Sequence, residues 1–320
     1  MLSRRSLIAS SVLLPLPALA QEGSYPGFLE GVRAEARRAG ISDATLRAAP
    51  FGSGPNARVL ELDRHQPEFT LTWAQYKARV LPQSRLEAAR AAFARNRGVL
   101  TEVWHRYGVD PRVIVGIWGL ESGFGAKTGT FNVVEALATL AYDGRRAAFF
   151  RAELMAALRI LDHGDVAPLG MTGSYAGAMG QPQFMSSSFL RYAVDFTGDG
   201  QRNIWTSLPD VFASVGNYLA RSGWKAGEVW GQPVRVPAGM TSPGGRDDVR
   251  SIAQWEREGV RREDGAPFRD DGRGAQAALL LPDGAGGDAF LVYGNFKAIR
   301  RYNPSDFYAL GVGLLGDAAA

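Results

Sequence analysis

Apolar residues recur at helical spacing over most of the chain. Their period, together with the glycines that follow several of the runs, predicts helices. These cover 28–39, 43–48, 84–107, 111–121, 145–161, 209–221 and the tail 295–315. The stretch 56–82 has a looser pattern and is assigned no helix. The chain is therefore expected to be mainly helical.

The pattern changes between residues 231 and 294. This segment carries most of the Pro/Gly turns, and three short apolar runs with strand character lie at 233–237, 278–282 and 289–293. We expect a small β-containing subdomain here, so the predicted fold class is mainly α (α+β).

The helix over 111–121 ends on a single acid. Glu121 falls on the same face as Ile114, Ile117 and Trp118, at spacings of seven, four and three residues. Burial and the negative end of the helix dipole both disfavour a charged carboxylate, so both raise its pKa. Such a group suits proton donation near neutral pH. On the helix alone, a partly exposed structural glutamate remains the commoner interpretation.

No second carboxylate forms an obvious pair with this acid. Glu135 lies in an apolar helical pattern and is expected on its surface, and Asp143 precedes a turn. Neither these residues nor Glu153 lies in a matching sequence context. A glycosidase of the usual type needs two carboxylates, so a mechanism with one acid is worth considering.

Composition narrows the class of protein. The chain has 320 residues, is 46% apolar and 21% charged, and carries a net charge of only +4, which does not indicate a nucleic-acid-binding protein. It has no cysteine, so we expect no disulfide, no thiolate metal site and no lipid attachment through cysteine. Its three histidines, His65, His105 and His163, lack the spacing of a zinc site.

Residues 1–20 have the pattern of an export signal. Arg4 and Arg5 precede an apolar run, which ends at a small-residue cleavage pattern, Ala-Leu-Ala, at 18–20. The run is too short to span a bilayer. A Sec signal and a twin-arginine signal both fit, and either predicts a periplasmic protein. No later run is long enough to be transmembrane.

Five motifs, in this order and register, carry a family resemblance: GLESGFG, AYDGRRAAFFR, SYAGAMGQPQFMSSSF, DFTGDGQRNIW and NFKAIRRYNPSDFYAL. Together they resemble the MltB family of lytic murein transglycosylases, over about residues 24–316. The resemblance implies a lysozyme-like helical core. We expect a transglycosylase domain over 21–320, with an N-terminal α region (21–100), the catalytic core (101–230), the β-containing part (231–294) and a C-terminal helix (295–320).

The resemblance also implies an activity. Such enzymes cleave the β-1,4 bond between N-acetylmuramic acid and N-acetylglucosamine in peptidoglycan and leave 1,6-anhydro ends, so the reaction is formally that of a lyase. Glu121 would protonate the leaving oxygen and later deprotonate the O6 hydroxyl, while the substrate's N-acetyl oxygen stabilises the cation. A hydrolytic muramidase and a non-catalytic peptidoglycan-binding protein are the alternatives. Glycan strands are the expected partner; no protein partner is indicated, and we expect a monomer.

Further site residues follow from the matched motifs. The loop that lines the sugar site corresponds to Ser174, Met179, Gln183 and Phe184, and Tyr218 and Tyr302 correspond to tyrosines facing the cleft. The pair Arg145 and Arg146 would contact peptide or sugar carboxylates, although a solvated helix start explains them as well. The chain departs from the family pattern at Phe149, where some members carry tyrosine, and at 181–182. Tyr76 is kept as a further aromatic candidate for the cleft.

The segment from Asp195 resembles the first half of an EF-hand loop. Asp195, Thr197, Asp199 and the carbonyl of Gln201 take positions 1, 3, 5 and 7, with glycine at position 6. Position 12 is not glutamate, and Asp210 is the candidate for a late acid. A turn without metal is the alternative. The expected role of calcium is structural, and we expect the chemistry to need no cofactor.

Overall fold

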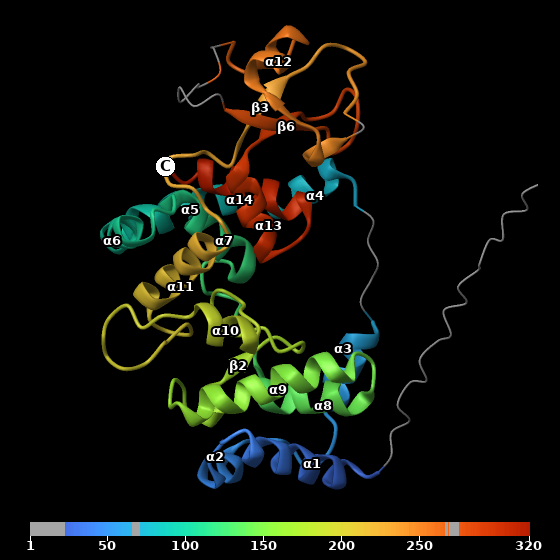
Figure 1. The fold of residues 1–320 in the computed structure, drawn as a ribbon, viewed down its shortest axis with the longest axis vertical. Coiled ribbons are helices and arrows are strands. Elements are labelled where there is room, and N and C mark those ends of the chain that lie inside the picture. The colour runs from blue at the N-terminus through green and yellow to red at the C-terminus, as the bar shows by residue number, and fades with distance from the viewer. Residues whose placement is uncertain (1–22, 66–70, 243, 266–267, 269–274) are drawn as a thin grey trace, which may run out of the picture.

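The computed structural model describes residues 23–65, 71–242, 244–265, 268 and 275–320. The predicted signal peptide, 1–20, lies outside the described residues. Figure 1 shows an elongated molecule with three bodies along its long axis: a helical lower body, a helical middle body and a small sheet at the other end. None of the helices in the described ranges combines the length and the hydropathy of a membrane span.

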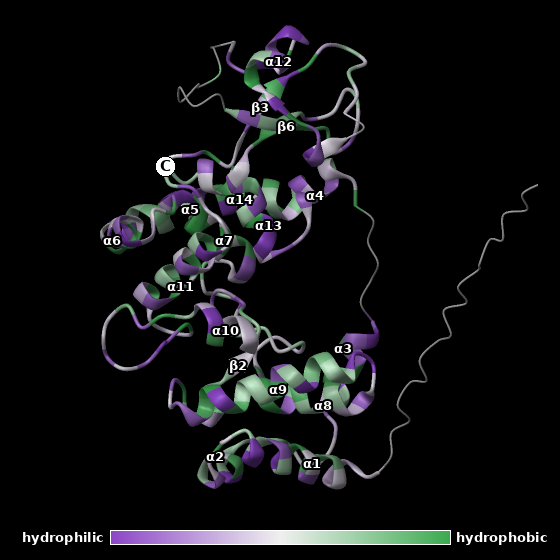
Figure 2. Cartoon of the chain, viewed as in Figure 1, coloured by the Kyte–Doolittle hydropathy of each residue, from purple (hydrophilic) through white to green (hydrophobic). Residues whose placement is uncertain are grey.

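The lower body contains the N-terminal helices and a long helical pair from the middle of the chain. Helix α8 is apolar almost all round and is buried accordingly between its neighbours (Figure 2). Strands β1 and β2 pair antiparallel beside it. The elements are α1 (Tyr25–Arg38), α2 (Asp43–Ala48), α3 (Ala57–Arg64), β1 (Phe131–Asn132), α8 (Val133–Asp143), α9 (Ala147–Asp162), η1 (Pro168–Gly170), β2 (Thr172–Gly173) and α10 (Ser186–Tyr192).

The middle body is built from two distant parts of the sequence. Its hydrophobic core joins the helices that follow residue 72 to the last helices of the chain. The elements are α4 (Trp73–Val80), α5 (Gln83–Arg95), α6 (Arg97–Tyr107), α7 (Pro111–Ser122), α11 (Leu208–Arg221), α13 (Gly294–Tyr302) and α14 (Asp306–Asp317).

A five-stranded antiparallel sheet, in the order β4-β6-β7-β3-β5, caps the middle body. Alternate residues of β6 serve its two faces: Leu279 packs on α12, and Leu280 joins the core of the middle body. The sheet is therefore attached to the helices by its own hydrophobic face. The elements are β3 (Gly231–Arg235), η2 (Gly245–Asp247), β4 (Val249–Ser251), α12 (Ile252–Arg257), β5 (Arg261–Arg262), β6 (Gln276–Leu280) and β7 (Phe290–Val292).

The expected mainly α fold with a small β-containing part is confirmed, with differences in its elements. The helix predicted over 84–107 is interrupted at Asn96, whose side chain donates to the Ala92 carbonyl and ends α5. The predicted tail helix is broken by an extended Asn303 before Pro304. The looser stretch 56–82 holds α3 and α4, both with side-chain N-caps. The division into four sequence ranges stays a prediction. In the structure, one hydrophobic core contains residues from both 25–64 and 131–193.

Helices α7 and α14 run antiparallel and approach closely at glycines. A Cβ on Gly116 would lie 2.3 Å from the Val312 carbonyl oxygen, and one on Gly316 would lie 2.6 Å from that of Arg112. Only glycine permits such a backbone approach. The contact fixes the end of α7 relative to the start of α14.

Candidate active site

Glu121 lies in the last turn of α7, where the helix ends on Gly123 in the left-handed conformation. Its Oε1 accepts a hydrogen bond from the Tyr308 hydroxyl at 2.6 Å. Burial raises the pKa of Glu121 to about 7, while the Tyr308 hydrogen bond opposes this increase. A carboxyl group with this pKa can give a proton near neutral pH and take one back. In the described part of the chain its hydrogen-bond partner is a phenol, not a second acid.

Tyr308 is held in the first turn of α14. Ser305 caps this helix and accepts from the Tyr308 backbone amide. Asp306 binds Arg300 of α13 at 2.5 Å and Arg246, beside the sheet, at 2.8 Å. These ion pairs connect the sheet to the turn that presents the phenol. Tyr308 is buried, so its pKa lies well above the usual value and it remains a hydrogen-bond donor.

Two more tyrosines lie near this pair. Burial and then the charge of Glu121 raise the pKa of Tyr76 and of Tyr302. The Tyr302 hydroxyl donates to the Pro182 carbonyl at 2.5 Å, and its ring centroid lies 4.7 Å from that of Tyr218. The structure therefore brings Tyr218 and Tyr302 into ring contact, whereas Tyr76 packs on Trp73 and Phe307.

The loop 173–184 forms a series of tight turns next to Tyr302. Met179 pairs in single antiparallel bridges with Gly173 and with Phe184. The Ser174 hydroxyl accepts from the Ala178 amide at 3.0 Å. Gln183 has a φ of 52° and donates to the Gly180 carbonyl at 2.7 Å. A non-glycine residue held in this conformation is a strained position of the kind that clusters at functional sites.

Two of the predicted loop residues point away from solvent. Met179 is fully buried and Phe184 retains 2% of its exposed area. Phe184 lies under Tyr218 and Tyr302, at centroid distances of 5.8 Å from each. Their physical role in this structure is therefore to support the loop from below, whereas Ser174 and Gln183 remain partly exposed.

Gln181 connects the loop to α7, the helix that carries Glu121. Its Oε1 accepts from Trp118 Nε1 at 2.7 Å, and its Nε2 donates to the Trp205 carbonyl at 2.9 Å. A Cβ on Gly125 would lie 2.5 Å from the same Oε1. Sequence reasoning treated position 181 only as a departure from a pattern; the structure gives it the link between Glu121's helix and the loop.

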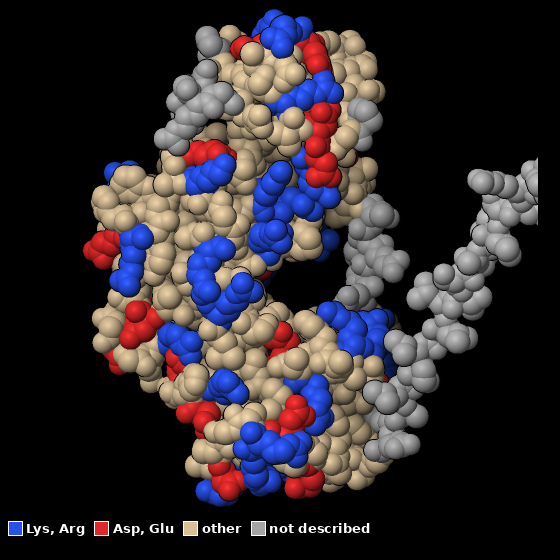
Figure 3. All heavy atoms as spheres, in the orientation of Figure 1, with Lys and Arg blue, Asp and Glu red and all other residues tan. Residues whose placement is uncertain are grey.

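The arginine pair lies on the lower body. Arg145 binds the Asp63 carboxylate at 3.0 Å while remaining partly exposed. Arg146, with a φ of 62°, places its guanidinium 4.4 Å from the Phe149 ring centroid, and Phe149 is 40% exposed. Figure 3 shows a hollow between the lower and middle bodies with Lys and Arg side chains around it.

The loop 195–210 folds around its own carboxylates. Asp195 accepts from the amides of Gly198 at 2.7 Å and Gly200 at 2.8 Å, as the first residue of an EF-hand does. Asp210 is buried and accepts from the amides of Phe196 and Asn203. Within the described ranges no three Asp, Glu, His or Cys side chains converge as metal ligands. Asp195 thus has the hydrogen bonds of the first residue of a calcium loop, but the carboxylates of the loop do not converge on one point.

Sequence reasoning missed Tyr308. It lies within the quoted segment NFKAIRRYNPSDFYAL, but no periodicity distinguishes a phenol that faces an acid from one that fills a core. The available signal is the set of glycines in α7 and α14, because glycines at helical spacing indicate a close helix contact. Such a contact would bring the segment of Tyr308 next to that of Glu121.

Comparison with known proteins agrees with this geometry. Residues 25–317 match the family described as Transglycosylase SLT domain. The chain is 37% identical, over 253 residues, to the membrane-bound lytic murein transglycosylase B of Escherichia coli K12, covering 78% of this chain and 67% of that protein. Its structure is similar to that of SltB3 from Pseudomonas aeruginosa in complex with NAG-anhNAM-pentapeptide (TM-score 0.88, 46% identity, 92% of this chain and 79% of that one). It is also similar to Escherichia coli SLT35 in complex with calcium (TM-score 0.73, 32% identity, 92% of each chain).

Proposed function

The chain belongs to the transglycosylase SLT family and is a lytic transglycosylase of peptidoglycan, and from this premise we propose that Glu121 alone performs its acid–base chemistry. The proposed reaction cleaves the β-1,4 bond between N-acetylmuramic acid and N-acetylglucosamine and leaves a 1,6-anhydro end. The observation that supports it is the half-buried Glu121, with a pKa of about 7 and a phenol as its hydrogen-bond partner.

The proposed steps return the proton to where it began. Protonated Glu121 gives its proton to the glycosidic oxygen as the bond from C1 to that oxygen breaks. The N-acetyl oxygen of the substrate stabilises the resulting cation. The Glu121 carboxylate then removes the O6 hydroxyl proton while O6 bonds to C1. Tyr308 stabilises the carboxylate between these steps, and a pKa near 7 suits both directions of transfer.

We propose that different surrounding residues contact different groups of the substrate. We assign Ser174 and Gln183 to the N-acetyl group, because both are partly exposed on a loop tied to Tyr302. Tyr76, Tyr218 and Tyr302 provide aromatic surface for the sugar rings. Met179 and Phe184 hold the loop in place. On the lower body, the residues that face carboxylates of the substrate peptide are Arg145, Arg146 and Phe149.

Mass spectrometry of digested peptidoglycan tests this proposal. We expect anhydro-ended products from the wild type, none from Glu121→Gln, and wild-type product levels from Glu102→Gln, which neutralises an exposed acid on α6. Circular dichroism would verify that both variants fold. Products one water heavier, with reducing ends, would instead identify a hydrolytic muramidase. No product from the wild type would leave a peptidoglycan-binding protein.

We also propose export to the periplasm through residues 1–20 and action there as a monomer in cell wall turnover. Cell fractionation with and without these residues tests the location, and substitution of the arginine pair at 4–5 separates a twin-arginine route from a Sec route. Light scattering of the mature chain tests the monomer.

Calcium is proposed as a structural ion in the loop 195–210, with Asp195, Thr197, Asp199, Gln201 and Asp210 as candidate donors. Three carboxylates, those of Asp195, Asp199 and Asp210, would more than neutralise its charge of +2, and the chemistry at Glu121 does not involve it. Added calcium should raise the melting temperature relative to chelator, and Asp195→Asn should remove that increase. An unchanged melting curve would dismiss the ion.

A further inference from the structure

A pocket lies at the ends of α7 and α14 that are opposite to Glu121 and Tyr308. Its volume is about 480 Å³, within the range of small-molecule sites. Arg112 at the start of α7 and Asp317 at the end of α14 line it, together with the segment before β3. Nine residues of α7 separate Arg112 from Glu121, roughly 14 Å along the helix axis. The pocket is therefore distinct from the site around Glu121.

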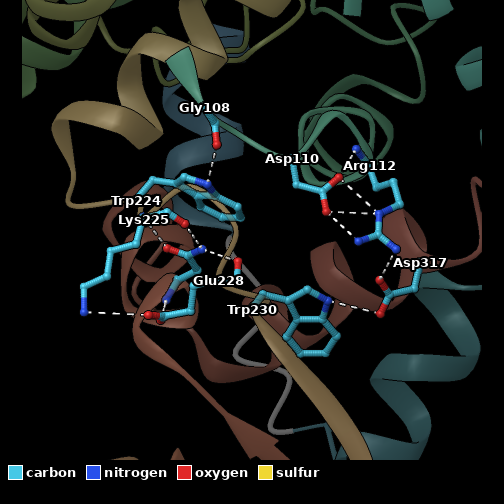
Figure 4. A network of polar contacts seen from close by, with 9 residues as sticks. Gly108, Asp110, Arg112, Trp224, Lys225, Glu228, Trp230 and Asp317 are labelled. Atoms are coloured by element: carbon cyan, nitrogen blue, oxygen red, sulfur yellow. Dashed lines mark hydrogen bonds and ion pairs between the residues drawn. The ribbon is translucent and has the colours of Figure 1, made fainter. Parts of the chain in front are cut away.

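The cations of this pocket are already matched by neighbouring carboxylates. Arg112 binds Asp110 through two nitrogens, with its Nη2 2.6 Å from Oδ2 (Figure 4). Arg262 binds Asp264 in the same manner, at 2.7 and 3.0 Å. Because both guanidinium groups face a carboxylate of their own, the pocket is poorly suited to an anion.

Asp317 is less well matched. Its Oδ2 accepts from Trp230 Nε1 at 3.1 Å, but its Oδ1 lies 3.7 Å from the nearest Arg112 nitrogen, beyond a hydrogen bond (Figure 4). Its side chain retains 40% exposure. Glu228, also in the lining, accepts from the Asn295 amide and lies 3.7 Å from Lys225. The pocket therefore has an excess of negative charge.

Three aromatic side chains also line the pocket, of which Trp224 is partly exposed and Trp230 is buried. Trp224 is fixed by a hydrogen bond from its Nε1 to the Gly108 carbonyl, Trp230 by its bond to Asp317, and Tyr293 accepts from Gln232. The two indoles and the Asp110–Arg112–Asp317 chain lie around one space in Figure 4. Aromatic faces beside a carboxylate attract ammonium groups, and they do so more strongly where water is excluded.

We propose that this pocket binds a primary ammonium group of a small ligand or of a peptide side chain, with Asp317 as its anion and the partly exposed Trp224 as its aromatic face. The inference does not depend on the reaction at Glu121, because it rests on a separate set of residues. Desolvation raises the pKa of Asp317 to about 6, against the lowering effects of Arg112 and of the Trp230 hydrogen bond, so the carboxylate is charged at pH 8 and largely neutral at pH 5.

Titration of the full-length protein with 1,5-diaminopentane, followed by tryptophan fluorescence and calorimetry, tests the proposal. We expect binding at pH 8, at least about tenfold weaker binding to Asp317→Asn, and unchanged binding to the control Glu102→Gln, because a charge-assisted contact contributes at least that factor. Trp224→Leu should weaken binding as well. The neutral analogue 1,5-pentanediol should not bind.

A second measurement follows the pH dependence of binding, first in the wild type. Binding to the wild type should weaken between pH 8 and pH 5 while the diamine stays charged. The carboxylates of Asp110 and Glu228 also face the pocket, together with Arg112, Arg262 and Tyr293, so loss of the pH dependence in Asp317→Asn assigns it to Asp317. A lysine-containing peptide that binds more tightly than the diamine, and that loses binding when its lysine side-chain nitrogen is acetylated, would identify a peptide amine as the ligand. Weaker binding of the peptide would identify a small amine. Equal binding of diol and diamine, or binding that does not change with pH, would overturn the proposal.

Discussion

Replacing Tyr308 with phenylalanine removes the hydroxyl that donates to Glu121 and leaves the ring in its buried place. This hydrogen bond stabilises the carboxylate and lowers its pKa against the larger effect of burial. A hydrogen bond to a charged group contributes about 1.5–3 kcal/mol, which corresponds to roughly one to two pKa units. The pKa of Glu121 should therefore rise from about 7 toward about 8 or above.

The alkaline limb of the pH–rate profile reports this change. In the proposed mechanism Glu121 must be protonated to act on the leaving oxygen, so kcat/KM should fall as pH rises through its pKa. In Tyr308→Phe this limb should move upward by about one unit or more, with a lower maximum because the carboxylate formed after proton transfer is less stable. Tyr107→Phe, on α6, controls for loss of a hydroxyl elsewhere. A limb that stays in place or moves to lower pH would refute the assigned role of the hydrogen bond.

Three further predictions concern stability. Gly116→Ala should destabilise the fold by about 1–3 kcal/mol in denaturant unfolding and reduce activity, because the added Cβ would meet the Val312 carbonyl. The control is Gly98→Ala, whose added Cβ would have open space around it within 4 Å, so this variant should be neutral or stabilising. Glu121→Gln should stabilise the protein at pH 8, by at most about 3 kcal/mol, and not at pH 4. The pKa of Glu121 is raised from 4.5 to about 7 on folding, so the wild type loses stability as pH rises between these values. Equal melting temperatures of wild type and variant at both pH values would contradict this. Asp306→Asn should cost about 1–2 kcal/mol and lower kcat more than it raises KM, since it releases both arginines that hold the turn of Tyr308; an unchanged kcat would separate these ion pairs from the site.

The sequence was sufficient for the local part of the site. The helix that presents Glu121 follows from an Asp-Pro start and an apolar period, and the structure places its end one residue beyond the predicted one. Interactions within a helix are short-range and leave a periodic signal. The raised pKa of Glu121 could be predicted for the same reason, from the face that the acid shares with its apolar neighbours.

The partners of Glu121 could not be predicted in this way. Tyr308 and Gln181 act through contacts between segments far apart in sequence, and their identity as core or site residues depends on which helix they meet. The break at Asn96 was missed because both halves keep an apolar stripe. Motif resemblance predicted the loop around Gln183 as part of the site, whereas the burial of Phe184 was visible only in the packed structure.

The hydrogen bond between Tyr308 and Glu121 joins residues 187 positions apart, across the contact of α7 with α14. Loop closure over that separation is a late and slow event in folding. A chain whose first 300 residues have been synthesised can contain a folded lower body and still lack the phenol that tunes its acid. Glu121 therefore acquires its hydrogen-bond partner only when α14 has docked on α7.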